Sequence, residues 1–197
     1  MAKFHYRESP TFGQKKAFAP YLSEDEELVL VTGLSSAYLR NKFVFFFLFP
    51  GILFLAAGAG LLMFLGVDKI IAIIMGAIFD LIVSLLHTIH LYHSHRYLLT
   101  TKRVIIKKGL FNVKLTAALF DKITHLEVDQ SFVDRILLHH GNIIINTAGL
   151  NKGEIVLESV DYPLEIKNLL ERLINRERES VGMRSVSVSA VEGEIID

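Results

Sequence analysis

The sequence predicts an α-helical membrane hairpin followed by a small all-β domain that is closed by one helix. Two long apolar runs, residues 43–65 and 70–91, lie in the first half of the 197-residue chain. Six segments of alternating apolar and polar residues follow within residues 96–176, and an amphipathic helical pattern comes after them. The apolar runs indicate where the chain resides, and the later segments indicate a compact body beside the membrane.

The two apolar runs are long enough to cross a bilayer. Residues 43–65 contain no charged side chain, and residues 70–91 contain one carboxylate, Asp80. A helix rises about 1.5 Å per residue, so about 20 apolar residues cross a hydrocarbon core about 30 Å thick. Only residues 66–69 separate the runs. We therefore expect residues 43–92 to form a two-span hairpin that stays in the bilayer.

Charges beside the two spans predict their orientation. Arg40 and Lys42 precede the first span. Arg96, Lys102 and Arg103 follow the second span, whereas the connecting loop holds one lysine and one aspartate. Lysine and arginine are enriched on the cytoplasmic side of membrane proteins. The sequence therefore predicts a multi-pass protein of the cell (cytoplasmic) membrane with both termini in the cytoplasm.

The N-terminal segment is expected to form a cytosolic arm over residues 1–42. Its first twenty residues mix cations with aromatic side chains and are read as a mobile, solvated segment. Residues 28–32 (Leu-Val-Leu-Val-Thr) are typical of a strand. A single strand needs a sheet to pair with, and the only candidate sheet lies beyond the hairpin. We therefore expect residues 28–32 to join that sheet as an edge strand.

The second span carries a polar stripe. Asp80, Ser84 and His87 follow one another at helical spacing and share one face. A carboxylate inside a membrane is costly, so this stripe should face protein or water rather than lipid. Small residues at 56–60 and 76–77 should let the two helices approach closely.

The β-rich part has a clear order of elements. The helix near its end should begin around Asp161 and Pro163. We expect residues 177–197, which show no helical period, to form a disordered tail. The predicted strands are 97–101, 103–108, 114–120, 125–130, 142–147 and 154–159. The apolar stripe of the helix consists of Ile166, Leu169, Leu170, Leu173 and Ile174.

Several stretches together resemble a known family. They are YLLTTKRVIIKKG at 97–109, residues 123–130, Asp134-Arg135-Ile136, GNIIINT at 141–147, and Pro163 with its helix. Their order and the attached hairpin are similar to the bacterial pleckstrin-homology-like (PH-like) domains. The resemblance implies a seven-stranded β-sandwich or partly open barrel capped by a C-terminal helix. It also implies a non-enzymatic binding or scaffolding module held at the bacterial inner membrane, and it carries over no phosphoinositide site.

Four cations close to the second span form a candidate lipid site. Lys102, Arg103, Lys107 and Lys108 are expected to attract anionic headgroups such as phosphatidylglycerol or cardiolipin. The alternative is a solubilising edge that only reflects the positive-inside bias.

A histidine cluster crowds the end of the second span. His87, His90, His93 and His95 leave three interpretations open, namely a metal site, a pH-responsive cluster, or ordinary residues of the membrane interface. On a regular helix His87 and His93 lie about 120° apart, so no shared metal is expected. Together with Asp80, the cluster defines the alternative function, a small oligomeric channel or transporter.

Composition and motifs narrow the function further. The chain has no cysteine, which excludes disulfides and thiolate chemistry, and its net charge is zero, so no nucleic acid partner is indicated. No catalytic constellation, phosphate-binding loop or cofactor motif is found in the sequence. The prediction is a non-catalytic module without cofactors. It would bind a protein partner or further copies of itself at the inner leaflet.

Overall fold

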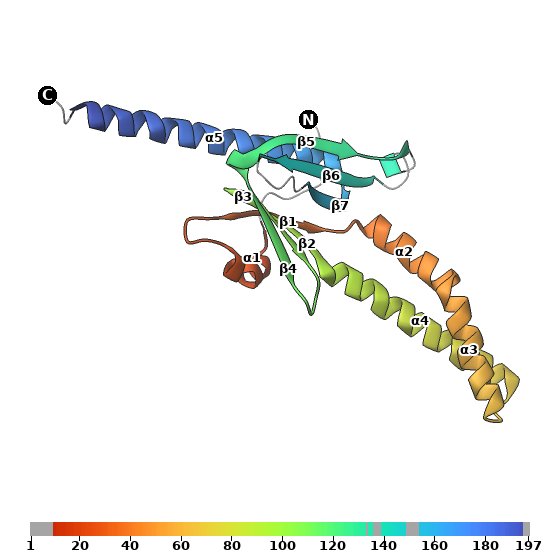
Figure 1. Cartoon of the computed structure of the whole chain (residues 1–197). Helices are drawn as coiled ribbons and strands as arrows, with labels where there is room; N and C mark the ends of the chain where they lie inside the picture. The colour runs from red at the N-terminus through yellow and green to blue at the C-terminus, as the bar shows by residue number, and fades with distance from the viewer. Residues whose placement is uncertain (1–9, 133, 136–138, 149–153, 195–197) are drawn as a thin grey trace.

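The computed structural model describes residues 10–132, 134–135, 139–148 and 154–194. Its strands form two antiparallel sheets, and the long helix α5 (Pro163–Glu194) lies along the three-stranded one (Figure 1). The four-stranded sheet has the order β1-β2-β3-β4, and the three-stranded sheet has the order β5-β6-β7. The strands are β1 Leu28–Gly33, β2 His95–Thr100, β3 Arg103–Lys108, β4 Lys114–Leu119, β5 Ile123–Asp129, β6 His140–Thr147 and β7 Ile155–Asp161.

The predicted edge strand is confirmed. β1 pairs antiparallel with β2, with Leu28 opposite Thr100 and Gly33 opposite Arg96. The β domain therefore begins at Leu28, and the predicted boundary at residue 96 leaves its first strand out. The helical hairpin is an insertion between the first two strands of the domain.

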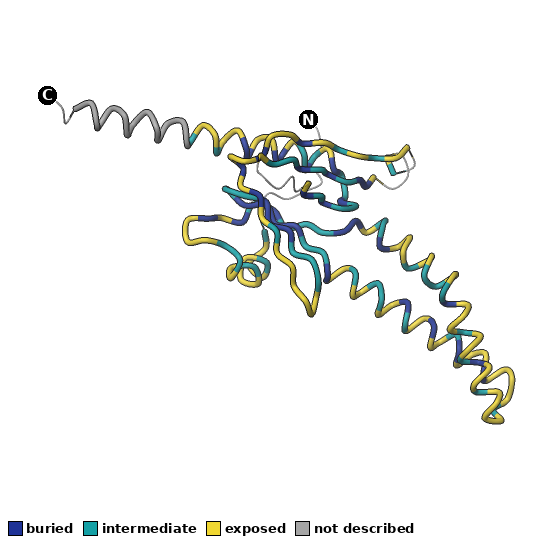
Figure 2. Tube along the Cα trace, in the orientation of Figure 1, coloured by how far each residue is buried: buried dark blue, intermediate teal, exposed yellow. Residues whose placement is uncertain are grey.

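The main core lies between the two sheets and α5 (Figure 2). Alternate residues of β2 point to opposite faces, so Tyr97 and Leu99 enter this core while Leu98 faces the other side. The three-stranded sheet contributes Ile143, Ile145 and Leu157. The predicted apolar stripe of α5 is confirmed, because Ile166, Leu169, Leu170, Leu173 and Ile174 are all buried in this core.

The N-terminal arm is more ordered than predicted. Residues 12–21 form α1 (Phe12–Phe18) and a 3-10 turn, η1 (Ala19–Tyr21). Phe18, Tyr21 and Leu22 pack against a small second cluster on the outer face of the four-stranded sheet. The sequence signal is the T-x-x-Q capping box, in which Thr11 and Gln14 bond to each other's backbone N–H. Residues 1–9 of the predicted arm lie outside the described residues.

The hairpin consists of three helices, α2 (Ser36–Leu48), α3 (Pro50–Phe64) and α4 (Lys69–Ser94). By length and composition, Ser36–Phe64 and Lys69–Ser94 could each cross a membrane. The first apolar helix thus begins earlier than the predicted residue 43, because the Ser35 hydroxyl caps it by accepting from the N–H of Ala37. It is interrupted at Phe49, since Pro50 has no N–H to continue the α2 ladder.

Helices α3 and α4 approach closely at small residues, as expected. A Cβ added to Gly58 would lie 3.8 Å from the Cα of Gly76. A Cβ added to Gly76 would lie 3.1 Å from the carbonyl oxygen of Leu55. Glycine at these positions lets the two backbones meet with little side chain between them.

The prediction of a disordered tail from residue 177 is wrong over most of its length. Helix α5 runs without interruption from Pro163 to Glu194. Its first turns are fixed by packing, and adding a residue to an existing helix needs no new nucleation. No proline follows Pro163 to stop the helix. Residues 195–197 lie outside the described residues.

Candidate functional site

The first connection between hairpin and domain is a set of hydrogen bonds at the start of α2. The N–H of Ser35 donates to the carbonyl of Ser159 at 2.7 Å, and its hydroxyl donates to Asp161 Oδ1 at 2.5 Å. The N–H of Ser36 reaches Asp161 Oδ2 at 3.4 Å. Because Ser35 both caps α2 and bonds to β7, the direction of α2 is fixed relative to the three-stranded sheet.

The second connection lies where α4 passes directly into β2. The N–H of Gly109, at the start of the β3–β4 turn, donates to the carbonyl of Ser94 at 2.7 Å. Gly109 has φ of +93°, and a Cβ there would collide with the backbone of Asn112. The Arg96 guanidinium lies 4.2 Å from the centroid of the Tyr92 ring. The β3–β4 turn is therefore held against the last turn of α4.

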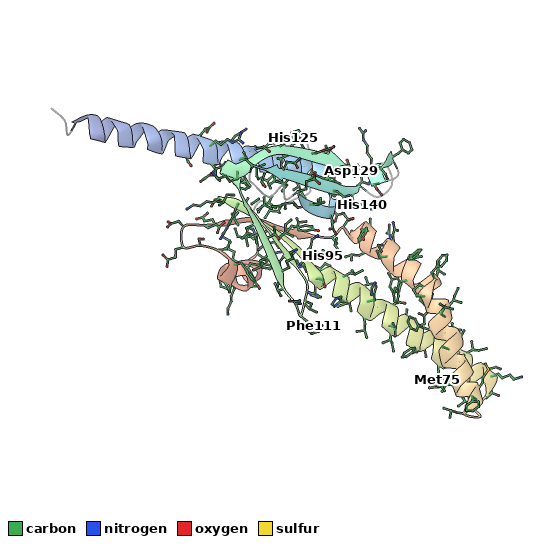
Figure 3. All side chains as sticks on the ribbon, in the orientation of Figure 1. Met75, His95, Phe111, His125, Asp129 and His140 are labelled. Carbon is green, nitrogen blue, oxygen red and sulfur yellow. The ribbon has the colours of Figure 1, made fainter. Side chains whose placement is uncertain are left out.

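A cleft of about 570 Å³ opens between α2 and the end of the three-stranded sheet. Figure 3 labels Asp129 and His140 on the end of this sheet that faces α2. We name this cavity the junction cleft. Its lining residues are Tyr38, Asn41, Lys42, Phe45, Asp129, Ser131, Asp134, His140, Gly141, Asn142 and Ser159.

Side chains in the junction cleft form a connected polar group. His140 Nε2 lies 3.5 Å from Asp134 Oδ1, and its ring meets that of Tyr38 edge to face with centroids 6.0 Å apart. Lys42 Nζ lies 5.4 Å from the centroid of the Tyr38 ring. The cleft is lined by one lysine, Lys42, and by two aspartates, Asp129 and Asp134, so it is not a purely cationic site. Sequence reasoning missed it, because α2 and β6 are far apart in the chain.

Glu26 and Arg103 form a bidentate ion pair in which the carboxylate is buried. Arg103 donates from Nε to Glu26 Oε1 at 2.9 Å and from Nη2 to Oε2 at 2.8 Å. The side chain of Glu26 is 1% exposed. Burial raises the pKa of Glu26, but hydrogen bonds from Arg103, from the Thr100 hydroxyl and from the Ser23 N–H outweigh it, so the pKa is lowered.

Glu158 links the two sheets. The hydroxyl of Tyr97, on β2, donates to the carbonyl of Glu158 on β7 at 3.1 Å and accepts from its N–H at 3.0 Å. Burial raises the pKa of the Tyr97 phenol far above its ordinary value. The Glu158 carboxylate lies 2.5 Å from Lys108 Nζ on β3.

The four cations of the predicted lipid site have separate surroundings. Arg103 bonds to Glu26, and Lys108 bonds to Glu158. Lys107 Nζ lies 5.3 Å from the centroid of the Tyr21 ring. Lys102 lies in the β2–β3 turn and is half-buried. Three of the four are therefore engaged by partners in the same chain, and an anionic headgroup would compete with those partners.

The predicted polar stripe of α4 faces the other two helices of the hairpin. Asp80 is 2% exposed and packs on the backbone of Gly51, where an added Cβ would lie 2.5 Å from Asp80 Oδ1. The Ser84 hydroxyl donates to Asp80 Oδ1 at 3.3 Å. The His87 ring stacks on Phe46 of α2 with centroids 4.3 Å apart. Within one chain these groups serve helix packing.

The clustered histidines do not converge. His90 faces Phe111 of the β3–β4 turn, His93 lies against Tyr92, and His95 begins β2. Among the residues that the structure describes, no three His, Cys, Asp or Glu side chains are placed to share a metal ion.

Two antiparallel sheets of four and three strands, closed by a C-terminal helix around one core, define a PH-like fold. The chain matches the family model described as bacterial PH domain over residues 43–174, and it belongs to that family. The matched residues begin in α2 and include α3 and α4. A comparison with curated proteins finds no match.

Solved structures with a similar arrangement come from two Shewanella species. One is a protein with a pleckstrin-homology domain from Shewanella loihica, at 11% identity and a TM-score of 0.42, with 82% of this chain and 94% of that chain covered. The other is a pleckstrin homology domain from Shewanella amazonensis, at 11% identity and a TM-score of 0.46, with 87% and 93% covered.

Proposed function

We propose that this chain is a membrane-anchored, non-catalytic PH-like module that binds a protein partner at the cytoplasmic surface of the inner membrane. The carrying observation is the insertion of the apolar hairpin between β1 and β2, with hydrogen bonds to the domain at both ends. An anchor built in this way holds the domain close to the membrane.

The surface of the hairpin supports the membrane part of the proposal. In the most apolar 18-residue stretches of its two arms, 11% and 22% of the residues are buried. A core helix of a soluble protein would be mostly buried, and a bilayer provides the missing apolar environment. Large exposed side chains of the hairpin include Phe45, Leu53, Phe79, Ile82 and Leu86.

The charge distribution supports the orientation. Arg40, Lys42 and Arg96 lie at the domain end of the hairpin. At its other end the charged residues are Asp68, in the turn between α3 and α4, and Lys69, the first residue of α4. The positive-inside rule then gives two spans with the domain and both termini in the cytoplasm.

A topology experiment tests this anchor directly. The chain has no cysteine, so single cysteines introduced by Val67→Cys and His125→Cys can be labelled without background. An impermeant maleimide added to intact spheroplasts should label Val67→Cys, while His125→Cys should react only after permeabilisation. Labelling of both positions from the same side would contradict the two-span anchor.

The junction cleft is the proposed binding site of the module. It lies between the first hairpin helix and the three-stranded sheet, so a ligand that enters it comes along the membrane surface. Lys42 together with Asp129 and Asp134 suits a partner that carries both charges, such as a segment of a membrane protein or of another copy of this chain.

Site-directed crosslinking tests the cleft. A photoreactive probe on Asn41→Cys, whose side chain lines the cleft, should capture a protein in native membranes. The matched probe on His125→Cys, an exposed position outside the cleft, should not capture it. Asp134→Asn, combined with Asn41→Cys, should reduce the adduct because it weakens the group around His140.

The products also separate the candidate ligands. An adduct of twice the mass of the chain indicates self-assembly. A protein adduct of any other mass indicates a different protein partner. Lipid adducts alone, or equal protein capture from both positions, would contradict a protein-binding cleft.

A further inference from the structure

The β3–β4 turn carries apolar side chains that the domain does not bury. Leu110, Phe111 and Val113 lie in the turn, and Leu115 follows in β4. Phe111 is 92% exposed, and the other three side chains are also exposed. A large aromatic side chain at the tip of a tight turn contributes nothing to this core, so its role is sought outside the domain.

The turn lies beside the last turns of α4. The ring of Phe111 faces the ring of His90 with centroids 6.4 Å apart and planes 22° apart. His90 precedes Ser94 by one helical turn. It therefore lies about 6 Å farther along the helix axis toward the apolar centre of the hairpin. The bond from Gly109 to the Ser94 carbonyl fixes this placement. Phe111 is therefore level with the helix rather than beyond its end (Figure 3).

The surroundings of the turn match the chemistry of a membrane interface. Tyr92 and His93 lie on α4 near the same level, and Arg96 stacks on Tyr92. Lys108 precedes the turn and Lys114 follows it. Aromatic rings with apolar side chains below and cations above are typical of segments that lie at the boundary between headgroups and acyl chains.

We propose that the β3–β4 turn is a second membrane contact, in which Leu110, Phe111 and Val113 insert into the boundary between headgroups and acyl chains of the leaflet where α4 emerges. The inference rests on the proposed two-span hairpin. The hairpin alone leaves the tilt of the domain open. A second contact on the same surface fixes that tilt, and with it the direction in which the junction cleft faces.

Tryptophan fluorescence in vesicles tests the insertion. The chain has no tryptophan, so Phe111→Trp gives a full-length protein with a single emitter. Phe79→Trp, in the middle of α4, reports the spanning helix, and His125→Trp reports the far side of the domain (Figure 3). All three positions are exposed, so the replacements leave the packing intact. Each protein is reconstituted into phosphatidylcholine–phosphatidylglycerol vesicles that carry brominated acyl chains.

The expected pattern distinguishes three depths. Phe111→Trp should lose about half of its emission, most strongly with bromine near the headgroup end of the acyl chain. Phe79→Trp should be quenched most by bromine near the chain end, and His125→Trp should keep its emission. Quenching of Phe79→Trp without quenching of Phe111→Trp overturns the inserted turn and leaves the proposed anchor standing. Absence of quenching at both positions overturns the anchor itself.

Discussion

The hairpin and the PH-like domain arrange their side chains in opposite ways. The domain buries Leu, Ile, Val and Phe between its two sheets and α5. The hairpin buries Asp80, Ser84, Gly51 and Gly76, and it exposes rows of Phe, Ile and Leu (Figure 2). In the proposed bilayer both parts follow the same rule, that apolar surface avoids water. The difference between them is what two environments acting on one chain would produce.

The largest expected effect comes from replacing phenylalanine by alanine once in the domain core and once on the surface of the hairpin. Phe120→Ala removes a fully buried ring from the domain core and should lower the free energy of unfolding by about 3–5 kcal/mol. Phe79→Ala, on the exposed surface of α4, should cost the domain less than about 0.5 kcal/mol. Urea titration of the full chain in micelles, followed by circular dichroism, measures both. Equal losses would show that the two parts unfold as one unit.

The buried ion pair is expected to give the next largest effect. Glu26→Ala leaves Arg103 without its carboxylate partner and should cost about 3 kcal/mol of domain stability. Glu171→Ala removes the more exposed pair with Lys167 and should cost less than about 0.5 kcal/mol. Thermal unfolding of the two variants provides the comparison.

The same pair predicts a pH dependence. The folded-state pKa of Glu26 is lowered, so its stabilisation is present above the ordinary value of 4.5 and is lost as the pH falls through the lowered pKa. The stability difference between the wild type and Glu26→Gln should therefore shrink below pH 4.5. A difference that stays constant down to the lowest accessible pH would contradict the lowered pKa.

The hairpin offers a matched pair of glycines. A Cβ on Gly51 would lie 2.5 Å from Asp80 Oδ1, whereas a Cβ on Gly60 would meet nothing within 4 Å. Gly51→Ala should destabilise the hairpin by about 1–3 kcal/mol, and Gly60→Ala should stabilise it slightly through its helix propensity. Adding Asp80→Ala should relieve the Gly51→Ala defect. Denaturation in lipid–detergent mixtures measures these effects, and equal behaviour of the two glycines would contradict the packing of Asp80 on the helix break.

The smallest expected effect is at the bridge between the sheets. Tyr97→Phe keeps the buried ring but removes both hydrogen bonds to the backbone of Glu158, at a cost of about 1 kcal/mol. Tyr92→Phe, at an exposed position on α4, should leave the stability of the domain unchanged. Thermal unfolding compares the two variants. If Tyr97→Phe is as stable as Tyr92→Phe, the bridge contributes nothing to the stability of the domain.

The pattern of apolar and polar residues predicted those elements that have one face toward the core and one toward water. The alternation in residues 95–108 and the stripe from Ile166 to Ile174 each record which face meets the core, so strands and helix appeared at the right places. The edge strand was also predictable, because β1 had no other sheet to join. The alternation and the helical stripe require no knowledge of distant residues, and the edge strand requires only that a sheet follows the hairpin.

Features built from distant segments were not predictable in the same way. The junction cleft combines Tyr38 with His140, and the ion pair combines Glu26 with Arg103, and no local pattern links such residues. Two local signals for the bounds of α2 were present in the sequence, but the long apolar run outweighed them. Ser35 marks the start of α2, and Pro50 marks its break, yet the uniform apolarity of residues 43–65 hides both.

The position of the hairpin between β1 and β2 also sets an order of assembly. During synthesis β1 leaves the ribosome first, and its pairing partner follows only after residues 34–94 have been translated. In a chain that spans the bilayer, the four-stranded sheet closes only once both spans are inserted and their cytoplasmic ends meet. Failed insertion would leave the first strand as an unpaired edge, open to aggregation and proteolysis.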